Sequence, residues 1–194
     1  MIDKNNITGI ILAGGKSSRM GTDKGFIKLN DKYFVQYSID ALKPFVSKIM
    51  IVSDNPDYDI FGLKRINDIT KNAGPIAGIC SGLEASKTEY NVILSCDIPL
   101  ITSEIVEKLI RNIDDTSQII QAESKGKTMP LIAIYKKEIT KTFNDFLKKE
   151  ERRLRVAINS CISKNVILEK DQELTTMNVN TQHELKAVKY AYKH

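Results

Sequence analysis

Apolar residues along this chain fall into two kinds of pattern that alternate. Residues 7–13 and 48–53 are short, mostly apolar and β-branched runs without polar alternation, which is typical of strands covered on both faces. Between these runs, apolar residues recur at the spacing of a helix, at Val35, Ile39, Leu42 and Val46. The order predicts a β-α-β unit.

The same alternation continues to the C-terminus. Further strands are expected at residues 64–67, 92–95, 118–122, 131–135 and 165–168. Helices are expected from Pro75 through Leu83, over Ile105 to Ile113, over Ile139 to Leu147 and after Thr181, which with Glu184 forms a capping box. No linker or repeat interrupts the pattern, so we expect one α/β domain over residues 1–194, with helices on both faces of a mostly parallel sheet.

Composition excludes several classes of protein. The 194 residues are 42% hydrophobic and 27% charged, as in an ordinary globular protein, and the net charge of +5 favours an anionic small molecule over nucleic acid. Cys80, Cys96 and Cys161 are odd in number and contain no C-x-x-C pair, which excludes a disulfide framework and a cysteine zinc site. We therefore expect a reducing, cytoplasmic location.

Histidine and membrane chemistry are also disfavoured. His183 and His194 are the only histidines, so a Ser-His-Asp or Cys-His arrangement would depend on His183 alone. No apolar run approaches the ~20 residues that span a bilayer. The sequence predicts no membrane partner.

A glycine-rich loop follows the first predicted strand. Gly14 and Gly15 allow backbone N–H groups to approach a phosphate closely, and the loop adds three cations, Lys16, Arg19 and Lys24. Ligands bind at the carboxyl ends of strands in open α/β sheets, where this loop is expected to lie. The loop therefore predicts a polyphosphate site, although a solvated Gly/Ser loop is the alternative.

Two common phosphate motifs are absent. Five residues separate Gly9 from Gly15-Lys16-Ser17, whereas a Walker A motif requires four, and Gly9 lies within the predicted strand. No G-x-G-x-x-G occurs either. Another class of nucleotide site is required.

The motifs resemble those of nucleotidyltransferases with a Rossmann-like fold, and nearly the whole chain resembles the molybdenum cofactor guanylyltransferase branch. The matching segments, in order, are Thr8-Gly9-Ile10-Ile11-Leu12-Ala13-Gly14-Gly15-Lys16, Arg19-Met20-Gly21, Asp23-Lys24-Gly25, Asp68, Gly74-Pro75-Ile76-Ala77-Gly78, Cys96-Asp97-Ile98-Pro99, Glu151-Arg152-Arg153 and Asn178-Val179-Asn180-Thr181. The resemblance implies a three-layer sandwich that transfers GMP from GTP to the phosphate of molybdopterin or its molybdenum-loaded form. A relative that uses CTP or another acceptor, and a non-catalytic nucleotide-binding regulator, are the alternatives.

The resemblance also implies roles for individual residues. Catalysis is expected from Arg19, Lys24 and Asp97. Nucleotide contacts are expected from Leu12, Ala13, Gly14, Gly15, Lys24, Asp68, Gly78 and Asp97. Partners are GTP, the molybdopterin acceptor and, transiently, molybdoenzymes or other proteins of cofactor biosynthesis.

Asp97 and Asp68 each have a second interpretation. Asp97 follows a strand, and a carboxylate at that edge suits Mg²⁺, the cofactor that the resemblance places there, whereas the alternative is a cap for the helix beginning near Thr102. Asp68 could contact the nucleotide, since guanine offers N–H donors, or could close an Asx-turn.

The acceptor is expected near the C-terminal motif. Asn178 and Asn180 flank Val179, so in an extended segment both amides face one side and could bind a pterin, unless they form only a polar turn. Arg152 and Arg153 are expected at the acceptor phosphate or on a solvated surface. Where the family has asparagine and a polar residue before proline, this chain has Ser53 and Met129, so no contact is assigned to either.

Overall fold

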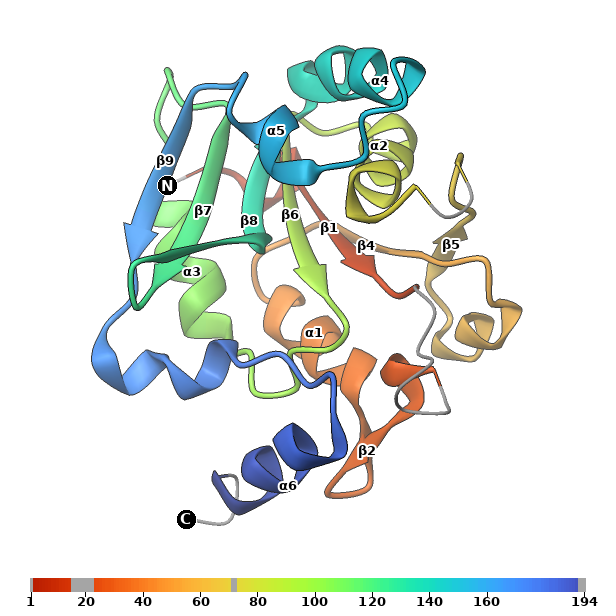
Figure 1. Ribbon diagram of the computed structural model, residues 1–194, viewed down its shortest axis with the longest axis vertical. Coiled ribbons are helices and arrows are strands. Elements are labelled where there is room, and N and C mark those ends of the chain that lie inside the picture. The colour runs from red at the N-terminus through yellow and green to blue at the C-terminus, as the bar shows by residue number, and fades with distance from the viewer. Residues whose placement is uncertain (1, 15–22, 71–72, 192–194) are drawn as a thin grey trace.

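The computed structural model describes residues 2–14, 23–70 and 73–191, which form a seven-stranded sheet of order β5-β4-β1-β6-β8-β7-β9 (Figure 1). Its strands are β1 (Ile7–Leu12), β4 (Lys48–Val52), β5 (Lys64–Ile66), β6 (Tyr90–Ser95), β7 (Ile119–Ser124), β8 (Lys127–Lys136) and β9 (Ser163–Ile167). Every pairing is parallel except those of β8 with β6 and β7. The prediction of a mostly parallel sheet is confirmed.

Helices cover both faces of this sheet. They are α1 (Phe34–Leu42), α2 (Pro75–Ala85), α3 (Ser103–Arg111), α4 (Thr140–Lys148), α5 (Leu154–Ile158) and α6 (Gln182–Ala191). Apolar residues of α1 and α3 join one core cluster, and those of α2, α4 and α5 join another on the opposite face. The result is the expected three-layer α/β sandwich.

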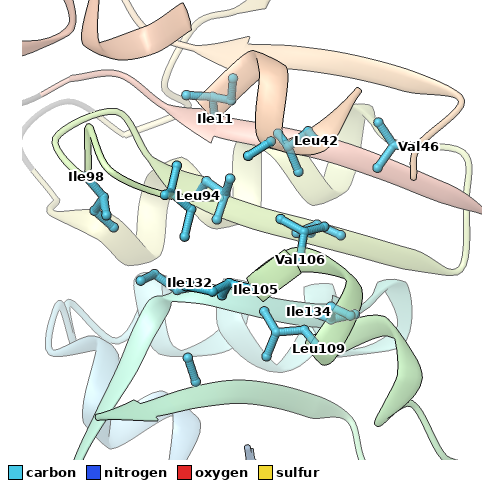
Figure 2. Packing of buried hydrophobic residues seen from close by; sticks show 14 of the residues in the cluster. Ile11, Leu42, Val46, Leu94, Ile98, Ile105, Val106, Leu109, Ile132 and Ile134 are labelled. Carbon is cyan, nitrogen blue, oxygen red and sulfur yellow. The ribbon is translucent and has the colours of Figure 1, made fainter. Parts of the chain in front are cut away.

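Strand β1 shows why its sequence lacks alternation. Ile10 and Ile11 are neighbours that face opposite layers, and both are completely buried. Figure 2 shows Ile11 beside Leu42 of α1, with Leu94 and Val106 in the same cluster. Burying each such side chain contributes about 1.5–3 kcal/mol to folding, so both faces of the strand require apolar residues.

The order of the strands creates a crevice. Numbered by their order along the chain within this sheet, β5, β4, β1 and β6 are the third, second, first and fourth strands. This is the order of a Rossmann-like half-sheet, in which the strand order reverses next to β1. Leu12 pairs with Val52 of β4 and with Ser95 of β6, so the three strands end at one edge. The segments that follow them therefore meet there.

A small hairpin that was not predicted from the sequence precedes α1. Strands β2 (Lys28–Leu29) and β3 (Lys32–Tyr33) are joined by Asn30 and Asp31, whose φ values are 48° and 61°. Positive φ at both central residues matches the type I′ turn of two-residue hairpins, and Asn and Asp tolerate it. Each strand of the hairpin has two residues, which is too few to show an alternation of apolar and polar side chains in the sequence.

Helix α6 packs onto this hairpin region instead of the main sheet. Val179, Leu185 and Val188 form a third core cluster with residues that include Leu29 and Phe34. At the start of α6, the N–H of Glu184 donates to Thr181 Oγ1 over 3.2 Å, which confirms the capping box. The C-terminal segment is thereby fixed beside the loop that contains Lys24.

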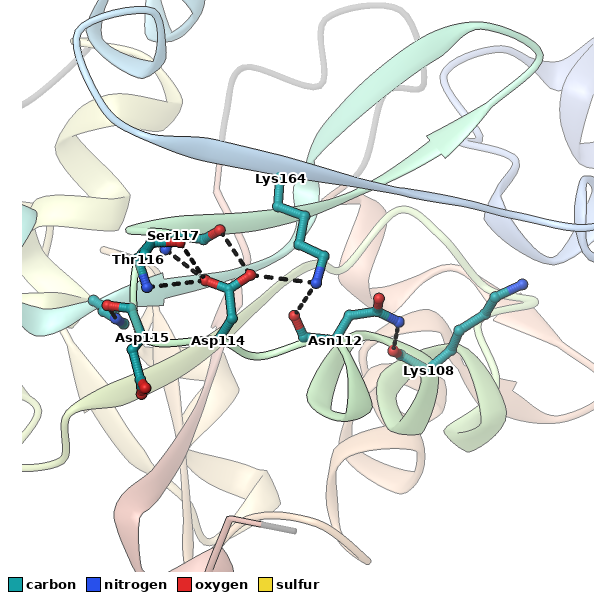
Figure 3. A network of polar contacts seen from close by, with 8 residues as sticks. Lys108, Asn112, Asp114, Asp115, Thr116, Ser117 and Lys164 are labelled. Carbon is teal, nitrogen blue, oxygen red and sulfur yellow. Dashed lines mark hydrogen bonds and ion pairs between the residues drawn. The ribbon is translucent and has the colours of Figure 1, made fainter.

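A polar network closes the connection between α3 and β7 (Figure 3). Asp114 accepts hydrogen bonds from the N–H of Ser117 at 2.7 Å and of Thr116 at 3.1 Å. Lys164 of β9 donates to Asp114 at 3.3 Å and to the carbonyl of Asn112 at 2.9 Å. These contacts attach β9 to the connection between α3 and β7 at one end of the sheet.

Predicted element ends differ from the observed ones by a few residues. Helix α1 ends at Leu42 and α3 at Arg111, so Val46 and Ile113 lie beyond them. Val46 is nevertheless buried, because the chain turns back onto the core. In the described residues, no helix is both long and apolar enough to cross a bilayer.

Candidate functional site

A cavity of about 500 Å³ lies at the carboxyl ends of β1, β4 and β6. It is lined by Leu12, Ala13, Gly14, Asp23, Val52, Ser53, Asp54, Asn55, Asp68, Gly74, Pro75, Gly78, Ser95 and Leu131. Five of the predicted nucleotide contacts, Leu12, Ala13, Gly14, Asp68 and Gly78, therefore come together. Gly15 and Arg19 lie outside the described residues, but Gly14 and Asp23 on either side of that segment both line the cavity.

Helix α2 forms one wall of this first cavity. It begins after Gly74, whose φ of 75° suits glycine, and Pro75 occupies the first turn. A Cβ on Gly78 would lie 3.3 Å from Leu12 Cδ2, tighter than most such contacts. Glycine at this position lets the helix pack closely against the end of β1.

Asp68 lies on another wall of the first cavity, where one carboxylate oxygen makes the Asx-turn contact and the other could contact a ligand. Its Oδ1 accepts from the N–H of Thr70 at 3.2 Å, which is an Asx-turn contact, and from Ser81 Oγ at 3.4 Å. Its Oδ2 makes no hydrogen bond to a described residue. Burial, with a smaller contribution from Asp54, raises the pKa of Asp68 above its usual value. Within the part of the chain that the structure describes, one oxygen of this partly buried carboxyl therefore has no partner and could accept from a ligand.

Lys24 begins a 3₁₀ turn, Lys24–Phe26, capped by Asp23, whose Oδ1 accepts from the Gly25 N–H at 3.1 Å. The Lys24 ammonium donates to Asp97 Oδ2 at 3.0 Å and to Asn180 Oδ1. The chain thus brings together one cation and two oxygen ligands from three distant segments.

Asp97 lies between Ser95, which lines the first cavity, and Ile98, which lines a second one. Its Oδ1 accepts from Ser95 Oγ at 2.6 Å, and its carbonyl accepts from the N–H of Val179 at 2.8 Å. Helix α3 is N-capped by Thr102 instead, so Asp97 does not act as its cap. This position favours the ligand role.

The second cavity, of about 690 Å³, lies between the β7–β8 hairpin and the C-terminal segment. Its lining includes Asn178 and Asn180, as the sequence predicted for an acceptor site, while Val179 between them is completely buried. Glu184 accepts from the N–H of Asn180 at 2.7 Å, and this hydrogen bond is the main cause that lowers the pKa of Glu184. Asn180 is thus fixed in the lining of the second cavity, where its side chain also accepts from Lys24.

The cations of the second cavity differ from those expected. Arg152 and Arg153 are exposed and do not belong to its described lining, and Arg153 pairs with Glu151. The carbonyl of Arg152 lies 3.8 Å from a Cβ placed on Gly74, on the side of the first cavity. Arg155, together with Lys125 and Lys127, lines the second cavity instead.

Several lining residues were missed by the sequence analysis. Ser53, Asp54 and Asn55 follow the carboxyl end of β4, and their position after a buried strand was the signal that could have identified them. Met129, to which no contact was assigned, lines the second cavity, and Leu131 lines both. These residues lie after β4 or within β8, so their proximity depends on the order of the strands in the sheet.

A Rossmann-like sheet with a cavity at its switch point, lined by Gly14 and by neighbours of Lys24 and Asp97, is typical of nucleotide-binding α/β proteins. Residues 9–164 match the family described as the MobA-like NTP transferase domain. The chain belongs to this family of nucleotidyltransferases.

Relatives by sequence carry consistent names. The chain is 34% identical over 179 residues to a probable molybdenum cofactor guanylyltransferase of Flavobacterium johnsoniae, covering 92% of this chain and 94% of the relative. It is 36% identical over 180 residues to the molybdenum cofactor guanylyltransferase of Yersinia pseudotuberculosis, covering 91% of each.

Solved structures agree on the fold. Molybdopterin-guanine dinucleotide biosynthesis protein A from Archaeoglobus fulgidus superposes with a TM-score of 0.81 at 20% identity, over 96% of this chain and 98% of that one. A 4-diphosphocytidyl-2C-methyl-D-erythritol synthase from Anaerococcus prevotii gives 0.75 at 14% identity, over 98% and 97%. At these identities the likeness concerns the fold alone.

Proposed function

We propose that this chain transfers GMP from GTP to the phosphate of molybdopterin, or of its molybdenum-loaded form, and releases pyrophosphate. The observation that carries the proposal is the pair of Lys24 and Asp97 between two cavities, one beside the glycine loop and one lined by Asn178 and Asn180. The names of the curated relatives supply the substrates.

In this proposal GTP occupies the first cavity. The N–H groups after β1 and the cations of residues 15–22 bind its phosphates, and Arg19 is one of these cations. Asp68 Oδ2 accepts from the donors on the guanine edge. Gly78 permits the close approach of α2 to Leu12 beside the base.

The proposed metal is Mg²⁺ at Asp97. Asp97 Oδ2 and Asn180 Oδ1 converge on one cationic group, the Lys24 ammonium, and this convergence supports a cation site there. Both are hard oxygen donors, which Mg²⁺ prefers together with water and substrate phosphates. When bound, Mg²⁺ would neutralise phosphate charge, and Asp97 would be its protein ligand.

The acceptor occupies the second cavity in this proposal. The lining holds three cations and two carboxylates, and one of the cations, Lys125, pairs with Glu173 at 3.0 Å. Lys127 and Arg155 are therefore the cations proposed for the acceptor phosphate, and Asn178 offers a neutral amide to the pterin. Arg152 and Arg153 would contribute only if their exposed side chains turned towards a substrate. Asn180 connects this cavity to Lys24.

The chemistry requires positioning and charge stabilisation more than proton transfer. An oxygen of the acceptor phosphate attacks the α-phosphorus of GTP, a phosphoanhydride bond forms, and the bond to pyrophosphate breaks with the electron pair leaving on pyrophosphate. The nucleophile is already anionic, so no general base is needed, and the exposed His183 lines neither cavity. Lys24 and Arg19 would stabilise the charge that develops on the α-phosphate and the leaving group.

A pyrophosphate-release assay tests the proposal. GTP, CTP and ATP are supplied in turn with Mg²⁺, with and without molybdopterin, and Asp97→Asn controls for contaminating activity. Release only with GTP and molybdopterin is expected. Equal release with CTP would contradict the assigned base, and GTP binding without release under any condition would indicate a non-catalytic regulator. A cytoplasmic location and transient contacts with molybdoenzymes stay predictions.

A further inference from the structure

A buried tyrosine lies directly behind the turn that carries Lys24. Tyr58 is completely buried, and its hydroxyl donates to Asp23 Oδ1 at 2.5 Å. The other oxygen of Asp23 accepts from Asn55 Nδ2 at 3.2 Å. Both donors come from the segment after β4, whereas Asp23 precedes Lys24. The carboxylate of Asp23 therefore attaches the Lys24 turn to a different strand of the sheet.

The backbone of the Lys24 turn is also in close contact with the Tyr58 hydroxyl. A Cβ placed on Gly25 would lie 2.0 Å from Tyr58 Oη and 2.8 Å from its Cζ, a clash that a fixed, buried ring cannot relieve cheaply. Glycine thus allows the turn to contact the hydroxyl directly. Asp23 caps the same turn through the Gly25 N–H, so Tyr58 contacts both the cap and the backbone of the turn.

The position of the Tyr58 ring is itself well determined. Its centroid lies 4.6 Å from that of Phe26 and 6.1 Å from that of Phe61. Asn55 N-caps the 3₁₀ turn that carries Tyr58 by accepting from the N–H of Asp57 at 3.0 Å. Phe26 closes the Lys24 turn from its other end, so a rigid aromatic cluster holds both turns together.

The hydroxyl of Tyr58 is held in its neutral, donating form near neutral pH. Burial, with Cys96 and Asp23 as further causes, holds the pKa of Tyr58 well above its ordinary value. Cys96 immediately precedes Asp97, so the hydroxyl lies near the segments of both members of the Lys24–Asp97 pair.

We propose that Tyr58 is a positioning residue for nucleotidyl transfer: through Asp23 and Gly25 it fixes the turn that directs the Lys24 ammonium onto Asp97. Tyr58 is completely buried, so it acts through Lys24 and not by contact with a substrate. The inference rests on the proposed function, because Lys24 is assigned there to the transferred phosphate. A tyrosine that only filled the core would stabilise the fold without affecting Lys24.

Tyr58→Phe removes the hydroxyl and retains the ring. Tyr37→Phe is the matched control, since the buried Tyr37 hydroxyl donates to the carbonyl of Leu29 at 2.7 Å and lies in the cluster of α1 and α6. Thermal unfolding of both variants measures how much stability each loses together with its buried hydroxyl hydrogen bond. Tyr58→Phe is expected to lower kcat by about 10- to 100-fold with little change in the KM for GTP, whereas Tyr37→Phe should keep kcat within about two-fold.

A double-mutant cycle tests whether Tyr58 affects kcat through Lys24. In a Lys24→Ala background, Tyr58→Phe should cause no further loss of kcat, because the group that it positions is absent. An equal loss with and without Lys24 would overturn the proposal, as would wild-type kcat in Tyr58→Phe. Should Tyr58→Phe fail to fold, Asn55→Ala tests the other oxygen of Asp23 in the same cycle, and the KM for GTP is measured beside kcat because Asn55 also lines the first cavity.

A crystal structure of Tyr58→Phe provides a readout that does not depend on activity. The Lys24 Nζ to Asp97 Oδ2 separation, 3.0 Å in the wild-type protein, is expected to exceed hydrogen-bonding distance or to be lost to disorder of the turn. An unchanged ion pair would overturn the positioning role. If the wild-type protein transfers no nucleotide, the proposed function fails, and this structure still decides whether Tyr58 holds Lys24.

Discussion

Lys24 and Asp97 form a 3.0 Å ion pair although they are 73 positions apart in the chain. Their side chains are only 21% and 13% exposed, so water screens the pair less than it would screen a surface pair. In the absence of substrates, each of these charged groups is therefore stabilised by the other. A ligand that binds between them must replace an existing interaction, and this determines how variants of either residue should behave.

Asp97→Asn is expected to abolish Mg²⁺-dependent turnover and to leave the fold intact. The amide is nearly isosteric and can keep the contact to Ser95, but it cannot supply a negative charge to a metal. Turnover should fall by at least about 100-fold when measured as pyrophosphate release across a Mg²⁺ titration. The exposed Asp115→Asn is the control. Near-wild-type turnover of Asp97→Asn in saturating Mg²⁺ would contradict the metal assignment.

Lys24→Ala should cost about 2–4 kcal/mol of transition-state stabilisation, because it removes a preorganised donor to developing charge. The measurement is kcat/KM for GTP. Lys28, which is exposed nearby and lines neither cavity of the site, provides the control variant Lys28→Ala. A change within a few-fold of wild type in Lys24→Ala would mean that this lysine does not contact the reacting phosphates.

The same variant should bind divalent cations more tightly when no nucleotide is present. Removing the Lys24 ammonium frees Asp97 Oδ2 and Asn180 Oδ1, the two oxygens that it occupies. Mn²⁺ affinity measured by calorimetry on the nucleotide-free protein is expected to rise several-fold over wild type. Unchanged or weaker Mn²⁺ binding would show that the ammonium and the metal do not share a position.

The two asparagines of the C-terminal motif should differ. Asn178 is exposed in the second cavity, so Asn178→Ala is expected to raise the KM for molybdopterin by a few-fold to ten-fold, the effect of one neutral hydrogen bond. GTP affinity, measured by calorimetry, should stay unchanged.

Asn180→Ala should lower single-turnover transfer as well, because Asn180 also accepts from Lys24. A loss of GTP affinity in Asn178→Ala with normal dependence on molybdopterin would place Asn178 at the nucleotide instead.

Acid should weaken the fold partly through Asp114. Hydrogen bonds from Ser117, first its N–H and then its hydroxyl, hold the pKa of Asp114 well below its usual range, and Lys164 adds to the effect. A lowered folded-state pKa stabilises the protein above the unfolded value of about 3.9, and this contribution is lost as pH falls below it. Asp114→Asn should therefore lower Tm at pH 7, and the difference from wild type should shrink below pH 4. Asp115→Asn is the matched control, and a difference independent of pH would contradict the assignment.

Local features of the fold could be predicted from sequence because their causes are local. The continuous apolar run before Gly14 and the helical spacing after Pro75 reflect burial on one or both faces of a single element. The capping box of Thr181 and Glu184 lies within one helical turn. The strand ends that carry Leu12 and Asp97 were predictable for the same reason, and with them one edge of the sheet as the place of the site.

Only the tertiary structure decided which residues from distant segments meet. Strand β8 runs antiparallel to β6, and Leu131 on β8 lines both cavities. The direction of a strand depends on how it pairs with its neighbours, and it does not change the spacing of apolar residues in the sequence. Arg155 of α5 lines the second cavity where Arg152 and Arg153 were expected. Those two residues precede the helix, with Arg153 as its extended N-cap, so no regular helical spacing relates their side chains to that of Arg155. The contact of Tyr58 with Asp23 joins residues 35 positions apart through a buried hydroxyl. Sequence periodicity reports burial and local hydrogen bonding, whereas such contacts arise only when the sheet order brings separate strand ends together.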